Sequence, residues 1–193
     1  MRLLINLLLA AVVIGLVWTL ISSIQEPIAF KAEKEKRERA VVERLMEVRT
    51  AQDLFRSIKG GFSPTFDSLR ETLMTDSFAV VKVIGDPDDP NFTGEIVYDT
   101  ILSPAIDSIQ TLGINLDSLS IVPYGGGVKF EIAADTITYQ KTTVNVVEVG
   151  IPRRVFMGKY KDKRFAKYDQ GYDPNKPIKF GNMNAPNLSG NWE

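Results

Sequence analysis

An uncharged run near the N-terminus restricts this chain more than any other feature of its sequence. Residues 3–24 read LLINLLLAAVVIGLVWTLISSI and contain no Asp, Glu, Lys or Arg. As an α-helix the run is about 33 Å long, enough to cross a hydrocarbon core of about 30 Å. It is either an uncleaved membrane anchor or a cleaved signal peptide. The anchor is favoured, because signal peptides have shorter apolar segments that end at small residues, whereas Gln25, Glu26 and Pro27 follow here.

The composition narrows the chemistry that the rest of the chain can perform. The 193 residues include no His and no Cys. Thiol nucleophiles, imidazole bases, disulfides and ordinary zinc sites are therefore excluded, and carboxylate, hydroxyl and lysine chemistry is left. No arrangement of nucleophile, base and orienting group is visible in the sequence. We therefore expect a protein that is not an enzyme and that holds no cofactor.

A charged helical segment follows the uncharged run. Pro27 marks a point at which the helix is expected to kink or restart. Oppositely charged residues one helical turn apart then stabilise an exposed helix, and these pairs are Glu33–Arg37 and Glu35–Arg39. We predict a transmembrane anchor over residues 1–26 and a stalk helix over residues 27–61.

The second half of the stalk carries an apolar stripe. Val41, Leu45, Val48 and Phe55 are spaced by four, three and seven residues, with Gln52 in the gap. Such spacing places all five on one face of a helix. The face either packs on the chain's own domain or meets a partner helix. About two heptads are fewer than a coiled coil needs, which favours the chain's own domain. These five residues are the candidate interaction residues of the stalk.

Glycine and proline mark the end of the stalk and the start of a second helix. Gly60 and Gly61 are expected to supply the left-handed conformation that ends a helix. Ser63 is expected to cap a second helix that begins at Pro64.

That second helix opens a segment that occurs twice. FSPTFDSLRETL at residues 62–73 is echoed by LSPAIDSIQTL at residues 102–112, and each copy is followed by two predicted strands. Three matching segments in one order favour a duplicated αββ unit over chance. We predict an α+β domain over residues 62–150, with one four-stranded antiparallel sheet, helices on one side, and a further buried strand at residues 142–149.

Charge is unevenly distributed beyond the stalk. Residues 61–150 carry 4 basic and 13 acidic side chains, whereas residues 151–193 carry 9 basic and 4 acidic ones. The latter residues are predicted to form a basic, mostly irregular tail. These charges either keep the surface soluble, which is favoured, or dock the tail on the acidic face of a neighbouring copy. The candidate docking residues are Arg153, Arg154, Lys161 and Arg164. A membrane-anchored, overall acidic chain is not expected to bind nucleic acid.

One acidic loop has the residue types of a calcium site. Asp86, Asp88, Asp89 and Asn91 provide the oxygen ligands that Ca²⁺ prefers. The same residue types build hairpin turns, and Pro90 interrupts the ligand spacing of an EF-hand. A turn is favoured over calcium.

The order of these segments resembles a known class of assembly protein. A short N-terminal tail, one span, a charged and then amphipathic helix, and a doubled αββ domain resemble the PilN/PilO and GspM class of inner-membrane proteins. That class belongs to type IV pilus and type II secretion machines. The resemblance implies a ferredoxin-like fold for the domain, a periplasmic location and a function in assembly.

The N-terminal third also resembles a type IV pilin or pseudopilin. A proline part-way along an apolar helix, the stretch VRTAQDLF at residues 48–55 and GGFSP at residues 60–64 are similar to the corresponding pilin segments. The leader-peptidase cleavage signature and the acidic residue of mature pilins are missing. This resemblance implies a filament subunit, and both resemblances imply the same kind of machine.

Two features of the sequence disagree about the orientation of the anchor. Basic residues after the run outnumber those before it, which favours a cytoplasmic C-terminus. Asp-(Ser/Thr)-aliphatic triplets resemble the O-glycosylation acceptor of Bacteroidota envelope proteins, and they begin at Asp67, Asp99, Asp107, Asp117 and Asp135. We give the triplets more weight and predict a bacterial inner-membrane protein with a cytoplasmic N-terminus and a periplasmic domain.

Together these patterns predict a non-enzymatic structural subunit of an envelope-spanning pilus-like, secretion or motility machine. Its expected partners are membrane lipid and other subunits of the complex, in a homo- or hetero-oligomer. Two alternatives stay open, a divergent pilin-like filament subunit and a membrane-tethered ligand-binding or sensing module.

Overall fold

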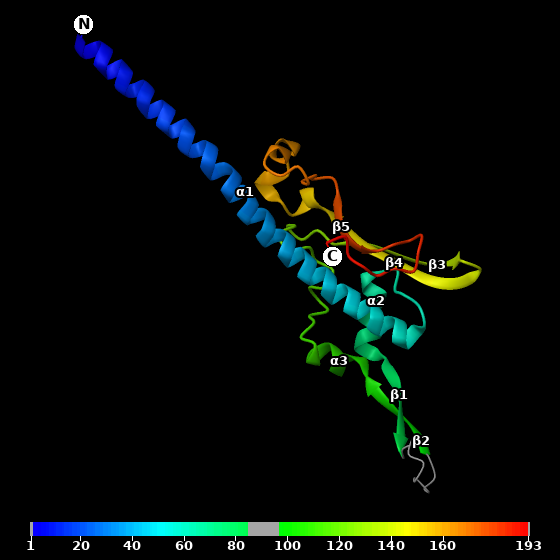
Figure 1. Cartoon of the computed structure of the whole chain (residues 1–193). Coiled ribbons are helices and arrows are strands. Elements are labelled where there is room, and N and C mark those ends of the chain that lie inside the picture. Colours follow the sequence, from blue (N-terminus) through cyan, green and yellow to red (C-terminus); the bar gives the residue numbers. More distant parts are fainter. Residues whose placement is uncertain (1, 85–96, 193) are drawn as a thin grey trace, which may run out of the picture.

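A single helix runs through more than a quarter of the chain. The computed structural model describes residues 2–84 and 97–192, with residues 80–84 and 97–99 described as backbone only. Its first element, α1 (Arg2–Lys59), is one continuous helix of 58 residues, shown in blue to cyan in Figure 1. Pro27 lies inside it and the helix does not restart there, although proline removes one main-chain hydrogen bond.

The two halves of α1 have different surroundings. Residues 2–26 are all exposed, and this half is long and apolar enough to cross a membrane, which makes it a candidate for a single span. The other half lies in the core of the domain, where Val41, Leu45, Val48 and Phe55 are buried. The prediction that the stripe packs on the chain's own domain is confirmed.

The turn after α1 is built differently from its prediction. Only Gly60 of the two glycines has a positive φ, +77°, and its N–H donates to the carbonyl of Arg56. The second helix, α2 (Phe66–Thr75), begins two residues later than predicted. Its N-cap is Thr65, whose hydroxyl accepts a hydrogen bond from the backbone N–H of Ser68.

A hairpin and a short helix follow α2. Strands β1 (Ser77–Ile84) and β2 (Val97–Pro104) pair antiparallel, with Ser77 opposite Pro104. Helix α3 (Ala105–Thr111) begins directly after β2 and buries Ala105 and Ile109 against the core. Figure 1 shows the hairpin projecting from the end of the domain that lies farthest from the N-terminus.

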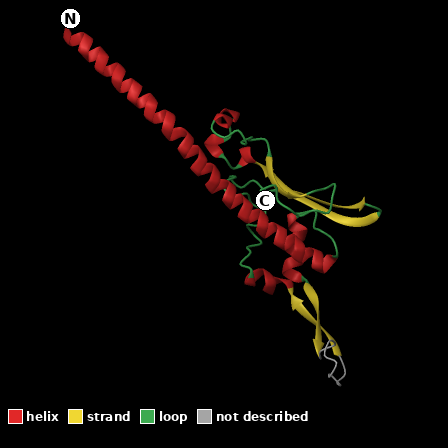
Figure 2. Ribbon diagram, viewed as in Figure 1, coloured by secondary structure: helices red, strands yellow, loops and turns green. Residues whose placement is uncertain are grey.

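The main sheet has three antiparallel strands in the order β3-β4-β5. They are β3 (Glu131–Tyr139), β4 (Thr142–Pro152) and β5 (Pro177–Gly181). The predicted buried strand at residues 142–149 is thus the central one. Figure 2 shows this sheet beside the C-terminal half of α1, and the side chains of Val149 and Phe180 are buried between the two.

The predicted four-stranded sheet of two αββ units is not what the described residues form. The first unit is present as α2, β1 and β2, but its hairpin lies in a separate sheet. In the second unit, residues 117–122 form turns with one isolated bridge at Ile121. The side chain of Asn115 accepts hydrogen bonds from the backbone N–H groups of Asp117 and Ser118, which a strand would need for pairing. The α+β class is confirmed.

The C-terminal residues belong to the domain. The boundary predicted after residue 150 falls inside β4, which continues to Pro152. Three 3₁₀ turns follow, η1 (Arg153–Val155), η2 (Gly158–Tyr160) and η3 (Lys163–Lys167), and then β5 joins the sheet. Trp192 is partly buried and packs against the core.

Candidate interaction site

The predicted interaction face of the stalk is covered by the chain itself. Gln52 is fully buried beside the four apolar residues of the stripe. Its side-chain amide donates to the carbonyl of Ser63 and accepts from the N–H of Ser63, both at 2.9 Å. The stripe is therefore unable to meet a partner helix while the domain is folded, and a partner must contact another surface. The residues predicted to be the interaction residues of the stalk are therefore buried within the chain's own domain. They are Val41, Leu45, Val48, Gln52 and Phe55.

The predicted docking residues of the tail do not act as one group. The guanidinium of Arg153 pairs with Glu38 at 2.7 Å and donates to the carbonyl of Lys176, so it is engaged inside the chain. Arg154, Lys161 and Arg164 are exposed. Docking of these three residues on a neighbouring copy stays a prediction.

Where α1 enters the domain, one phenylalanine is enclosed by aromatic rings. Phe30 is fully buried, and its ring lies 5.0 Å from that of Tyr172, 5.4 Å from Phe165 and 5.5 Å from Tyr160, centroid to centroid. Tyr168 completes this aromatic cluster at 6.1 Å. The hydroxyl of Tyr172 donates to the carbonyl of Tyr160, and burial raises the pKa of that hydroxyl to about 12.

Ion pairs hold the same segment to α1. The ammonium of Lys34 lies 2.7 Å from the carboxylate of Asp169, and this hydrogen bond lowers the pKa of Asp169. Arg37 pairs with Glu33 at 2.7 Å, lowers the pKa of that carboxyl, and also donates to the carbonyl of Phe156. The predicted pairs Glu33–Arg37 and Glu35–Arg39 are confirmed, and the first of them also helps to fix the domain.

The β1–β2 hairpin, called the β1–β2 arm below, is uncovered on both faces near its base. Consecutive residues of a strand point to opposite faces. Ile101 is 46% exposed and its neighbour Leu102 is 70% exposed. Among the described residues, β1 and β2 pair with no third strand, so each has one free edge. The arm therefore offers both apolar side chains and unpaired backbone groups.

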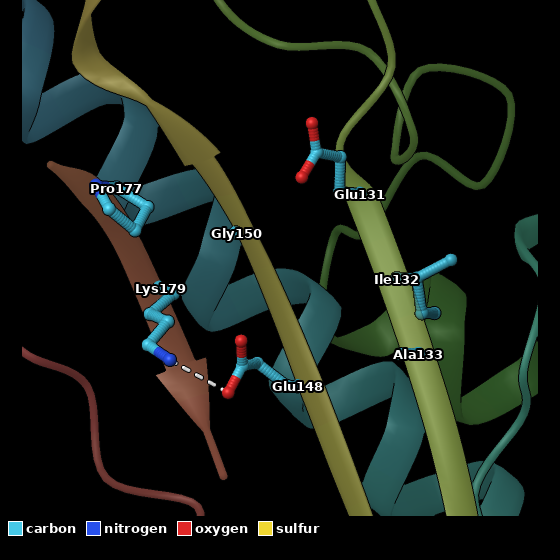
Figure 3. Close-up of a pocket in the computed structure, with 7 residues that line it drawn as sticks. All are labelled: Glu131, Ile132, Ala133, Glu148, Gly150, Pro177 and Lys179. Carbon is cyan, nitrogen blue, oxygen red and sulfur yellow. Dashed lines mark hydrogen bonds and ion pairs between the residues drawn. The ribbon is translucent and has the colours of Figure 1, made fainter. Parts of the chain in front are cut away.

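The outer face of the main sheet has a hollow of about 180 Å³. Figure 3 shows Glu131, Glu148 and Lys179 on this face, with α1 behind the strands. The ammonium of Lys179 lies 2.7 Å from the carboxylate of Glu148, so one of the two carboxylates is already paired. The hollow provides charged groups but no nucleophile held by a base.

Metal chemistry has no support in the part of the chain that is described. Within residues 2–84 and 97–192, no group of three acidic side chains is arranged to hold a metal ion. The calcium alternative lies outside the described residues, since Asp86, Asp88, Asp89 and Asn91 all fall between them.

Comparisons of the chain with protein-family models, with curated proteins and with solved structures found no match. The functional proposals therefore rest on the residues and their geometry.

The sequence did not single out the aromatic cluster. The alternation of basic and aromatic residues in the tail was visible, but Phe30 stands alone in a charged segment that reads as a solvated stalk. A lone aromatic residue nearly two turns beyond the uncharged run is the signal that could have indicated a contact there.

Proposed function

We propose that the protein is a non-enzymatic, single-pass subunit of an envelope-spanning pilus-like, secretion or motility machine. Its N-terminus lies in the cytoplasm, α1 crosses the inner membrane once, and the domain lies in the periplasm. The observation that supports this best is the continuity of α1, which is exposed and uncharged over residues 3–24 and contributes to the core of the domain over residues 41–55.

This continuity fixes the domain to the anchor. Between the end of the uncharged run and Lys59, α1 extends for about 52 Å. No loop separates anchor and domain, and the aromatic cluster and the Lys34–Asp169 pair attach the domain close to residue 30. A partner that binds the far end of the domain is thereby held at a set distance from the bilayer.

The β1–β2 arm is the surface that we assign to a partner protein. A two-stranded hairpin is marginally stable alone in water. Contact with another protein would remove Ile101 and Leu102 from water and pair the free strand edges. The arm also lies at the end of the domain farthest from the N-terminus, where another subunit of the machine can reach it (Figure 1).

A filament subunit is the second candidate, and the exposed half of α1 favours it. Apolar side chains along residues 3–24 are removed from water either by lipid or by the same helices of neighbouring copies. Shearing separates the two cases. The assembly subunit stays with the membrane after cells are sheared, whereas the filament subunit appears in the sheared fraction.

Photo-crosslinking in cells tests the arm. A benzophenone amino acid at Leu102 should form an adduct with another envelope protein, whereas the same group at the exposed Tyr139 of β3 should not. An adduct between two copies would identify the partner as the chain itself. The proposal for the arm is refuted if Leu102 gives no adduct, or the same adducts as Tyr139, in cells that assemble the machine.

A further inference from the structure

A cleft opens between α1 and the 3₁₀ turns where the uncharged run ends. It has a volume of about 330 Å³. One wall is α1, with Ser22, Gln25, Glu26 and Ala29, and the other wall carries Lys159 and Arg164 from η2 and η3. In Figure 1 these turns form the orange segment beside the middle of α1. The cleft therefore begins within the last turn of the apolar helix.

The two cations of this cleft lack an ion-pair partner among the described residues. Lys159 and Arg164 are exposed, and no carboxylate of the described residues lies within ion-pair distance of either. Asp169 pairs with Lys34, and Glu26, which lines the cleft, accepts from the hydroxyl of Tyr168 and lies 3.9 Å from the ammonium of Lys167. The lining of the cleft thus carries two cations against the single carboxylate of Glu26, and its net positive charge is what an anion site requires.

The aromatic residues under the cations suit the boundary between lipid and water. The ammonium of Lys159 lies 4.9 Å from the ring centre of Tyr160, and the guanidinium of Arg164 lies 4.7 Å from that of Phe165. Each cation therefore lies over an aromatic ring, while its side chain stays exposed to water. Tyrosine and basic residues with apolar stems are enriched at this depth of membrane proteins.

We propose that this cleft binds the phosphate of an anionic phospholipid in the leaflet that faces the domain. The proposal depends on the single-pass anchor proposed above, because a span over residues 3–24 places Ser22 and Gln25 at the level of the headgroups. Three further exposed basic side chains belong to the same segment and strengthen the attraction to an anionic surface. They are Lys161, Lys163 and Lys167.

Lipid retention tests the site on the full chain. The protein is reconstituted in nanodiscs of phosphatidylcholine and phosphatidylglycerol, released into mild detergent, and analysed by native mass spectrometry for the lipid that stays bound. We expect preferential retention of phosphatidylglycerol. Replacing both Lys159→Gln and Arg164→Gln should reduce that preference about 30-fold, since each basic residue near an anionic surface contributes about a factor of five.

Two further variants make the result decisive. The double substitution Lys129→Gln and Arg56→Gln also removes one lysine and one arginine charge, but from exposed positions outside the cleft. This variant should keep the preference for phosphatidylglycerol. Lys159→Arg with Arg164→Lys keeps both charges and should keep it as well. Either of two results refutes the proposed lipid site alone: the unmodified chain inserts and shows no preference for phosphatidylglycerol, or the Lys129/Arg56 variant loses the preference equally. Failure of the unmodified chain to enter nanodiscs refutes both the proposed anchor and the proposed lipid site.

Discussion

The pair of hydrogen bonds between Gln52 and Ser63 gives a prediction that the structure makes quantitative. Both residues are fully buried, and Gln52→Met keeps the length of the side chain but removes both bonds. The N–H and the carbonyl of Ser63 then lack partners, at about 1–3 kcal/mol each. Burial of the methionine offsets about 1–2 kcal/mol. We expect a net loss of about 2.5 kcal/mol in the free energy of unfolding, the middle of the range of about 0–5 kcal/mol that these contributions allow.

Thermal unfolding of the full chain in detergent measures this loss. For a domain of this size, about 2–4 °C of Tm corresponds to each kcal/mol, so a loss of about 2.5 kcal/mol in Gln52→Met should lower Tm by about 5–10 °C. The matched control is Gln110→Met, the same substitution at an exposed position of α3, which should leave Tm within about 1 °C. Equal Tm values for the two variants would refute the reasoning.

A charged substitution at the same position adds a dependence on pH. In Gln52→Glu, the protonated acid can donate to the carbonyl of Ser63 and accept from its N–H, whereas the ionised form cannot donate. The folded-state pKa of that glutamate therefore lies above its unfolded value of about 4.3. The folded state then binds more protons, so stability relative to the unmodified chain falls as pH rises above about 4.3. A difference in Tm that stays constant between about pH 4 and pH 8 would contradict this.

Three further substitutions test the attachment of the domain and the turns of the sheet. The hydrogen bond to Lys34 lowers the pKa of Asp169, so its stabilisation is present above the unfolded pKa and is lost as pH falls through the folded value. Asp169→Asn should therefore lower Tm at neutral pH, and its Tm should converge with that of the unmodified chain as pH falls through the folded pKa of Asp169. Phe30→Ala should cost about 3–5 kcal/mol and increase hydrogen exchange in the three 3₁₀ turns, while Phe30→Leu should cost less; unchanged exchange in both would contradict the role of the aromatic cluster. Gly181→Ala places its Cβ 2.0 Å from a backbone oxygen at a φ of +81°, and it should lower Tm far more than Gly60→Ala. A Cβ at Gly60 meets no atom within 4 Å, so only the backbone strain of about 1–2 kcal/mol applies there. Equal Tm losses would show that the close contact at Gly181 is relieved without cost.

Elements whose pattern extends over several turns could be predicted from the sequence. The spacing of Val41, Leu45, Val48 and Phe55 determines one helix face, because a helix repeats every 3.6 residues. The same pattern left open what covers that face. Gln52 reads as a gap in the stripe, and its partner Ser63 lies beyond a turn, where sequence spacing carries no information about contact.

Elements that depend on distant partners were missed or misread. Strand β5 has five residues between Pro177 and Gly181, and its pairing with β4 is the reason that it is a strand. Residues 117–122 alternate as a strand would, but the side chain of Asn115 takes up the backbone donors. In the first case tertiary pairing decides the structure, and in the second a local bond between a side chain and the backbone competes with strand formation.

The unbroken course of α1 past Pro27 makes the protein a stiff lever. Over about 52 Å, a change of about 10° in the inclination of the anchor moves the far end of the helix sideways by about 9 Å. In the single-pass arrangement proposed above, a small reorientation within the bilayer would be converted into a displacement of the β1–β2 arm by roughly the width of a helix. Such a displacement needs no change in the fold of the domain.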